Sequence, residues 1–119
     1  MKKSYCYWKV VVPGTHNYPG HDGLLQFKHR HLFHISVRAE ISHHDRELEY
    51  LEERDILAGY LRDTFEEEKL GGFDFSGSSC EHIADRLLEF YCSQEKYNGR
   101  GMRVSVFEDG ENGSMVCEE

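Results

Sequence analysis

The stretch His29–Ile41, HRHLFHISVRAEI, determines the fold that we expect for this chain. Apolar residues alternate with polar ones from Phe33 onward, which is typical of a strand that buries one face. His29 and His31 continue the alternation in the same phase, so both side chains are expected on the buried face. A strand that carries two imidazoles on its apolar side suggests a chemical role for them.

Two histidines spaced in this way can present two nitrogens to one metal ion such as zinc. The alternative is that hydrogen bonds satisfy both imidazoles in a partly buried sheet. A third histidine favours the metal, and His16 follows the apolar residues 10–12 and Pro13-Gly14. His21 competes for this place, but its segment Gly20-His21-Asp22-Gly23 predicts a mobile loop. Three histidines with one open position are typical of catalytic zinc.

The length and charge of the chain limit what surrounds this site. The sequence has 119 residues, which suits one domain, residues 1–119, with a single core. Its net charge of −8 argues against a nucleic-acid partner, because such binding depends on lysine and arginine contacts to phosphates. Lys28, Arg30 and Arg38 fall on the face opposite His29 and His31, where we expect solvent or a subunit contact.

The cysteines and the hydropathy pattern indicate the compartment. Cys6, Cys80, Cys92 and Cys117 are scattered without a CxxC pair, so we expect free thiols and no four-cysteine zinc cluster. The sequence contains no signal-peptide pattern and no transmembrane run, so no membrane association is expected. Together these features predict a cytoplasmic protein.

Four strands and two helices are expected in the order ββααββ. The aromatic and β-branched residues 5–12 predict a first strand that ends at Pro13-Gly14, before the strand His29–Ile41. Apolar residues at helical spacing predict an amphipathic helix that follows Leu48-Glu49-Tyr50 and ends at Gly71-Gly72. The prediction is an α+β fold.

The second half of the chain continues this pattern. A second helix is predicted to begin at Ser78, because Glu81 three residues later fits a capping box. Strands at Met102–Glu108 and residues 114–117 are predicted to flank a hairpin loop. Glu108 continues the apolar face of its strand, where a carboxylate could accept paired hydrogen bonds from an aminopyrimidine-like ring. The alternative is that the strand has already reached solvent at Glu108.

Four motifs in this order resemble those of the 6-pyruvoyltetrahydropterin synthase and 6-carboxytetrahydropterin synthase family. His29-Arg30-His31-Leu32-Phe33 resembles the family's HGHxY strand, and His16 corresponds to its earlier zinc histidine. Ser78-Ser79-Cys80-Glu81-His82 resembles the family's PTxEN helix start, and Val106-Phe107-Glu108-Asp109 resembles its VxET strand end. The resemblance spans nearly the whole chain.

The resemblance implies a tunnelling fold, in which an antiparallel sheet carries two helices on one face and oligomerisation completes a barrel. Family members are commonly homohexamers built from two trimers. It also implies Zn²⁺ on His16, His29 and His31, and a pterin or purine-like ligand held by Glu108. The activity implied is that of a zinc-dependent lyase that converts dihydroneopterin triphosphate or a related pterin.

The sequence departs from the family at the positions that move protons. Leu25 stands where the family carries a catalytic cysteine, and Asp74 is followed by Phe75 instead of a histidine. Arg30 replaces the glycine between the two zinc histidines. These departures leave the catalytic residues unassigned, and they leave open a protein that binds a pterin or nucleotide without converting it.

Overall fold

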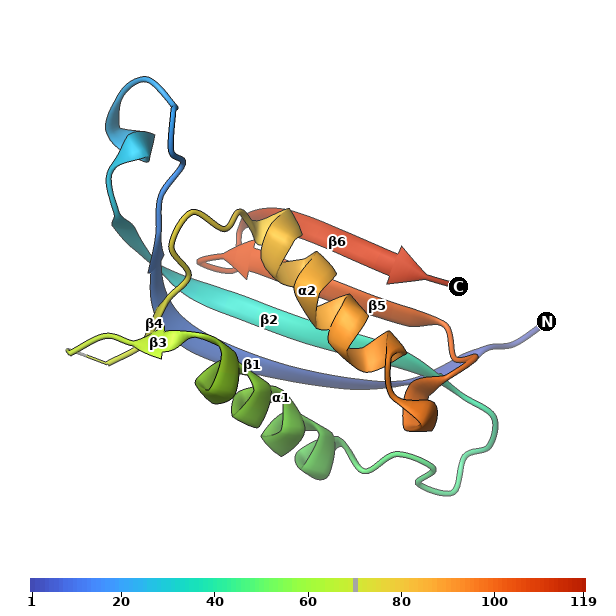
Figure 1. Ribbon diagram of the computed structural model, residues 1–119. Coiled ribbons are helices and arrows are strands. Elements are labelled where there is room, and N and C mark those ends of the chain that lie inside the picture. Colours follow the sequence, from blue (N-terminus) through green and yellow to red (C-terminus); the bar gives the residue numbers. More distant parts are fainter. Residues whose placement is uncertain (70) are drawn as a thin grey trace.

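The computed structural model describes residues 1–69 and 71–119 and has an α+β fold, as predicted. One sheet has the strand order β3-β4-β1-β2-β5-β6, and both helices cover the same face of it (Figure 1). The strands are β1 (Ser4–His16), β2 (His29–Ile41), β3 (Glu66–Glu67), β4 (Phe73–Asp74), β5 (Met102–Glu108) and β6 (Asn112–Glu118). The helices are α1 (Tyr50–Thr64) and α2 (Cys80–Cys92), with short turns η1 (Leu24–Gln26) and η2 (Glu95–Tyr97).

The long antiparallel pair of β1 and β2 forms the centre of the sheet. It runs from the pairing of Ser4 with Ile41 to that of His16 with His29. Strand β1 therefore continues through Pro13-Gly14, where a turn was predicted. Gly14 is needed for packing instead, because a Cβ atom there would lie 2.5 Å from the Phe75 ring. The sheet is mixed, not wholly antiparallel as predicted, since Gly14 and Thr15 of β1 pair in parallel with β4.

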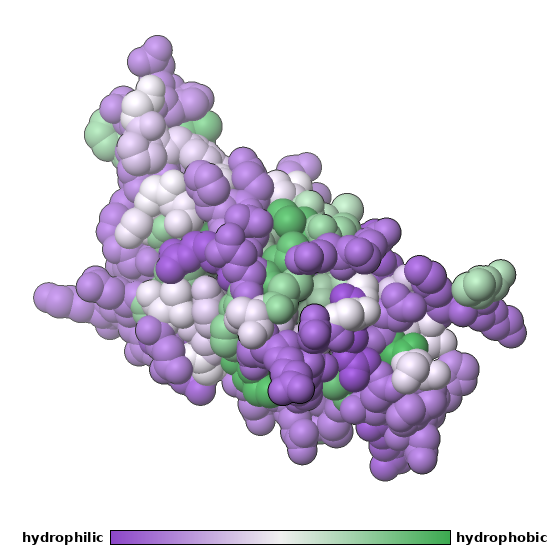
Figure 2. Space-filling model, turned by 45° about the vertical axis from the view of Figure 1, so that its right-hand side comes forward, coloured by the Kyte–Doolittle hydropathy of each residue, from purple (hydrophilic) through white to green (hydrophobic). Residues whose placement is uncertain are grey.

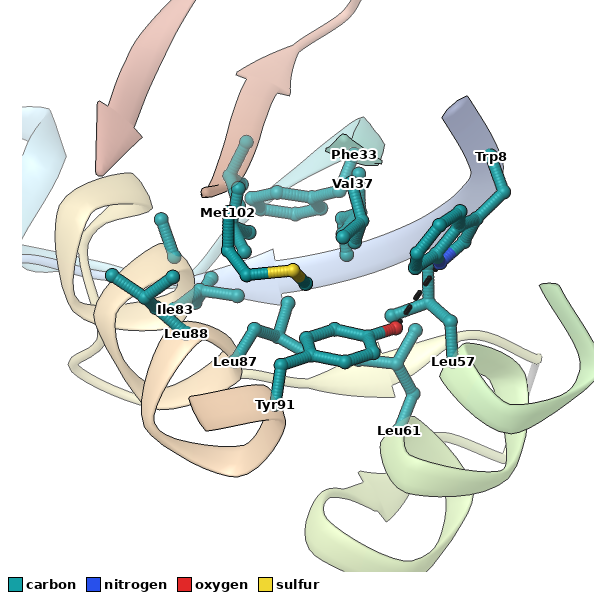
Figure 3. Close-up of a cluster of buried hydrophobic side chains, with 14 of the residues drawn as sticks. Trp8, Phe33, Val37, Leu57, Leu61, Ile83, Leu87, Leu88, Tyr91 and Met102 are labelled. Carbon is teal, nitrogen blue, oxygen red and sulfur yellow. Dashed lines mark hydrogen bonds between the residues drawn. The ribbon is translucent and has the colours of Figure 1, made fainter. Parts of the chain in front are cut away.

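The core lies between the helices and one face of the sheet. The predicted phase of β2 is confirmed, because Phe33, Ile35, Val37 and Ala39 are all fully buried. Leu57 and Leu61 of α1 and Ile83, Leu87 and Tyr91 of α2 cover them (Figure 3). The indole Nε1 of Trp8 donates to the Tyr91 hydroxyl at 3.1 Å, so the buried polar atoms of both rings are paired.

The connection between the helices differs from the prediction. Helix α1 ends at Thr64, well before Gly71-Gly72, because Phe65 takes an extended conformation and packs on Phe75 with ring centroids 4.8 Å apart. Strands β3 and β4 then form a short hairpin. Gly71 and Gly72 lie in its turn with φ angles of 89° and 91°, which explains the glycines without a helix end.

Helix α2 begins one residue later than predicted. Ser79, not Ser78, is the N-cap, and its hydroxyl accepts from the His82 N–H at 3.2 Å. Glu81 accepts from the Ser114 hydroxyl at 2.9 Å and so joins α2 to β6. Strand β5 has the predicted bounds, whereas β6 is longer than predicted.

The loop between β1 and β2 exposes apolar residues, and the helices were compared with the requirements of a membrane span. The loop between β1 and β2 projects from the body of the molecule (Figure 1). Figure 2 shows apolar atoms on the sides of this projection and hydrophilic ones at its tip. Leu24, Leu25 and Phe27 of this loop are exposed. Among the described residues, no helix combines the length and apolar character needed to cross a membrane.

Candidate metal centre

Strand pairing brings three histidines together at one end of the sheet. His16 at the end of β1 pairs with His29 at the start of β2, and His31 follows on the same face. One nitrogen from each ring lies within 4.8 Å of the others, which is a group that could hold a metal ion. The interpretation that chose His16 over His21 agrees with this geometry, because His21 lies exposed in the β1–β2 loop outside the cluster.

The three imidazoles share one pattern of hydrogen bonds. Nδ1 of His16 lies 3.0 Å from the carbonyl oxygen of Ser78, and Nδ1 of His29 lies 3.0 Å from that of Phe27. Nδ1 of His31 lies 2.8 Å from Oδ2 of Asp109. These oxygens can only accept, so each Nδ1 carries a proton, and each Nε2 of a neutral ring keeps a free lone pair. Such outer hydrogen bonds are how proteins orient metal-binding histidines.

The environment of His16 is the strongest evidence that the site could bind a cation. Its side chain is fully buried, and burial lowers the pKa of His16, which favours the neutral ring that a metal requires. Its Nε2 has no hydrogen-bond partner in the described part of the chain. An unpaired buried acceptor is costly, and a bound cation would satisfy it.

Glu108 lies against this cluster from β5. Its Oε1 is 3.0 Å from Nε2 of His16, and its Oε2 is 3.4 Å from Nε2 of His31. The side chain of Glu108 is 25% exposed, so the strand reaches the edge of the core at this residue. The carboxylate is therefore partly exposed, as is the side chain of His31 at 22%.

Asp109 is a site residue that the sequence reasoning missed. Besides accepting from His31, its carboxylate accepts from the Leu32 N–H at 2.9 Å, and its own N–H donates to the Leu32 carbonyl at 2.7 Å. The Leu32 N–H, followed by His31, lowers the pKa of Asp109 and keeps it ionised. The Asp109-Gly110 pair signalled only a turn, and nothing in the periodicity showed that the side chain would reach back to β2.

Cys80 also approaches the site, although it is far from the histidines in sequence. Its thiol donates to Oε1 of Glu108 at 3.7 Å. Burial, followed by the charge of Glu108, raises the pKa of Cys80 to about 12, so the thiol stays protonated and is a poor nucleophile. Cys80 and Glu108 border a small pocket of about 210 Å³ with Tyr18, Glu81, Asn112, Gly113 and Ser114.

Two other residues singled out in the sequence lie outside the cluster. Asp74 forms an ion pair with Lys28 at 2.7 Å, and this lysine lowers the pKa of Asp74. Leu25 lies exposed on the projecting loop. Neither residue belongs to the histidine group.

The ligand set alone defines what the site can bind. Three imidazole nitrogens beside a carboxylate can hold a divalent transition-metal ion, and imidazole suits zinc, copper, iron and nickel. No protein-family model matches this chain, and no curated protein matches it either. The function must therefore be inferred from the residues themselves.

Proposed function

We propose that this chain is a zinc-dependent enzyme of the 6-pyruvoyl and 6-carboxytetrahydropterin synthase type, which acts on dihydroneopterin triphosphate or a related pterin. The observation that carries the proposal is the convergence of one nitrogen from each of three histidines whose rings are each fixed through Nδ1. This arrangement lies at the positions where the sequence resembles that family. Three histidines with room for a further ligand favour zinc in a catalytic setting.

Each residue of the site has a role in this proposal. His16, His29 and His31 would hold zinc, which when bound polarises a hydroxyl or carbonyl oxygen of the substrate and acidifies the neighbouring C–H groups. Glu108 would accept hydrogen bonds from the N–H groups of the pterin ring. Asp109 would fix the His31 ring and raise its basicity as a ligand.

We further propose that the chain forms a tunnelling-fold homo-oligomer, a trimer or a hexamer. The pocket beside Glu108 is smaller than most ligand sites, which measure roughly 300–1,000 Å³, so a neighbouring copy would complete it. The sheet face away from the helices exposes large apolar residues on β1, β2 and the edge strand β6, and such faces mark association sites. These residues are Tyr5, Tyr7, Val11, Leu32 and Met115.

A second candidate is a binding protein of the same fold that captures a pterin without converting it. The ion pair between Asp74 and Lys28 favours this candidate, because an ionised and paired carboxylate is poorly suited to moving protons. The protonated thiol of Cys80 also offers no substitute for the cysteine that Leu25 replaces.

The proposal is tested by incubating the zinc-loaded protein with dihydroneopterin triphosphate and following products by mass spectrometry. We expect conversion by the unchanged protein and none by His31→Ala. Binding without product would favour the capture protein, and neither binding nor product would contradict both candidates.

A further inference from the structure

We infer that Glu108 is a fourth ligand of the metal and that an incoming ligand displaces it. The carboxylate would close the coordination shell in the resting protein and leave it when another donor arrives. This inference rests on the proposed metal site, but it does not depend on the identity of the organic ligand.

The distances around Glu108 suit a shared ion. Two ligand atoms bonded at about 2.1 Å to a tetrahedral metal lie roughly 3.4 Å apart. Oε1 of Glu108 is 3.0 Å from Nε2 of His16, and Oε2 is 3.4 Å from Nε2 of His31. One carboxylate thus stands at ligand-to-ligand distance from two of the three histidines.

The chemistry of these atoms also favours a positive partner. Each Nδ1 already donates its proton, so in the neutral rings the Nε2 atoms face the carboxylate as acceptors. The contact between His16 and Glu108 is not a hydrogen bond, since Nε2 of His16 lacks any partner of that kind within residues 1–69 and 71–119. A divalent cation between these atoms would relieve both contacts at once.

The surroundings of Glu108 would allow it to leave the metal. Within the described residues, its ion-pair partners are His16 and His31, and no lysine or arginine holds it. Its other contact is the thiol of Cys80, a weak neutral donor. Because Glu108 borders the pocket, the released carboxylate could accept from the N–H groups of a ligand there. A heterocycle that carries both N–H donors and an oxygen could bind the metal through its oxygen at the position that Glu108 leaves. Its N–H groups could then donate to the released carboxylate.

The inference is tested by titrating the metal-free protein with Co²⁺, whose visible spectrum reports the number and kind of ligands. Glu108→Gln preserves shape and removes the anionic ligand, and Glu111→Gln is the matched control because Glu111 lies exposed in the adjacent hairpin loop. We expect Glu108→Gln to bind Co²⁺ more than about tenfold more weakly, with a changed spectrum, since even outer-shell substitutions cost this much. Glu111→Gln should bind Co²⁺ with the same affinity and the same visible spectrum as the unchanged protein.

Displacement is tested with azide, a small anionic metal ligand, on the same Co²⁺-loaded proteins. We expect azide to change the spectrum of the unchanged protein, but at higher concentration than for Glu108→Gln, where no carboxylate competes. Failure of the unchanged protein to bind Co²⁺ would overturn the proposed metal site itself. Normal Co²⁺ binding with equal affinities and spectra in Glu108→Gln, whose fold is checked by circular dichroism, would overturn only the role of Glu108. An azide-insensitive spectrum would overturn displacement.

Discussion

Titratable groups are buried in two clusters, around Glu53 in the first turn of α1 and around His16 at the end of β1, and the two clusters differ in the chemistry of their neighbours. Glu53 on α1 accepts from the Tyr97 hydroxyl and forms an ion pair with Lys96, so donors surround an acceptor. At the other end, His16 presents a free nitrogen to the carboxylate of Glu108. Within the part of the chain that the structure describes, each cluster has one buried atom without a hydrogen bond, Oε1 of Glu53 and Nε2 of His16. The difference is that an ammonium group faces Oε1 of Glu53, whereas a carboxylate faces Nε2 of His16.

The largest effect is expected from breaking the histidine cluster. His31→Ala removes one of three direct ligands, so metal affinity should fall by more than about 100-fold, beyond the loss that outer-shell changes cause. Isothermal titration with Zn²⁺ measures this change, with His21→Ala as the matched control from the exposed loop. Unchanged zinc affinity in His31→Ala would show that this residue is not a ligand.

The Glu53 cluster should respond in stability and not in metal binding. Glu53→Ala leaves the buried Tyr97 hydroxyl without its acceptor and opens a cavity, so the free energy of unfolding should fall by about 2–3 kcal/mol. Urea denaturation of the metal-free protein measures the loss. The folded variant should keep its zinc affinity, and a joint loss of both would mean that the clusters are coupled.

Asp109→Asn changes the hydrogen-bond acceptor of the candidate ligand His31 and leaves the ligand itself in place. The asparagine keeps a similar shape but loses the charge that makes His31 a better donor to the metal. We expect zinc affinity to fall by about tenfold. Asp55→Asn on the exposed side of α1 is the control, and equal affinities in the two variants would argue against a role for Asp109.

The smallest effect is expected for Lys96→Met. The Lys96 side chain is 44% exposed, so solvent weakens its attraction to Glu53. Loss of the ammonium should reduce the free energy of unfolding by about 1 kcal/mol. A larger loss than that of Glu53→Ala would indicate that the charge of Lys96, and not the Tyr97 hydrogen bond, maintains this end of the core.

The candidate metal ligands could be predicted from the sequence, whereas the groups that accept hydrogen bonds from those ligands could not. Strict alternation in β2 and β5 decides which face His29, His31 and Glu108 occupy, and antiparallel pairing decides that these side chains become neighbours. The supporting groups are the carbonyls of Ser78 and Phe27 and the carboxylate of Asp109. They come from segments outside regular strands, whose course does not follow from periodicity.

The fold likewise contains elements that the sequence predicts and elements that depend on contacts between distant segments. The central strands and both helices follow from hydrophobic patterning, whereas the β3–β4 hairpin does not. Phe65 continues the helical spacing of α1 but is extended, because it packs against Phe75 from a distant part of the chain. The contact of Cys80 with Glu108 likewise depends on how α2 lies over β5, which local sequence does not encode.

The most direct test is the metal content of the untagged protein, measured by elemental mass spectrometry on samples of verified native mass. Three converging histidines, each fixed through its Nδ1, predict about one zinc per chain. A protein that carries no zinc, even after refolding in its presence, would contradict the metal site and leave the histidines as unusual members of the core.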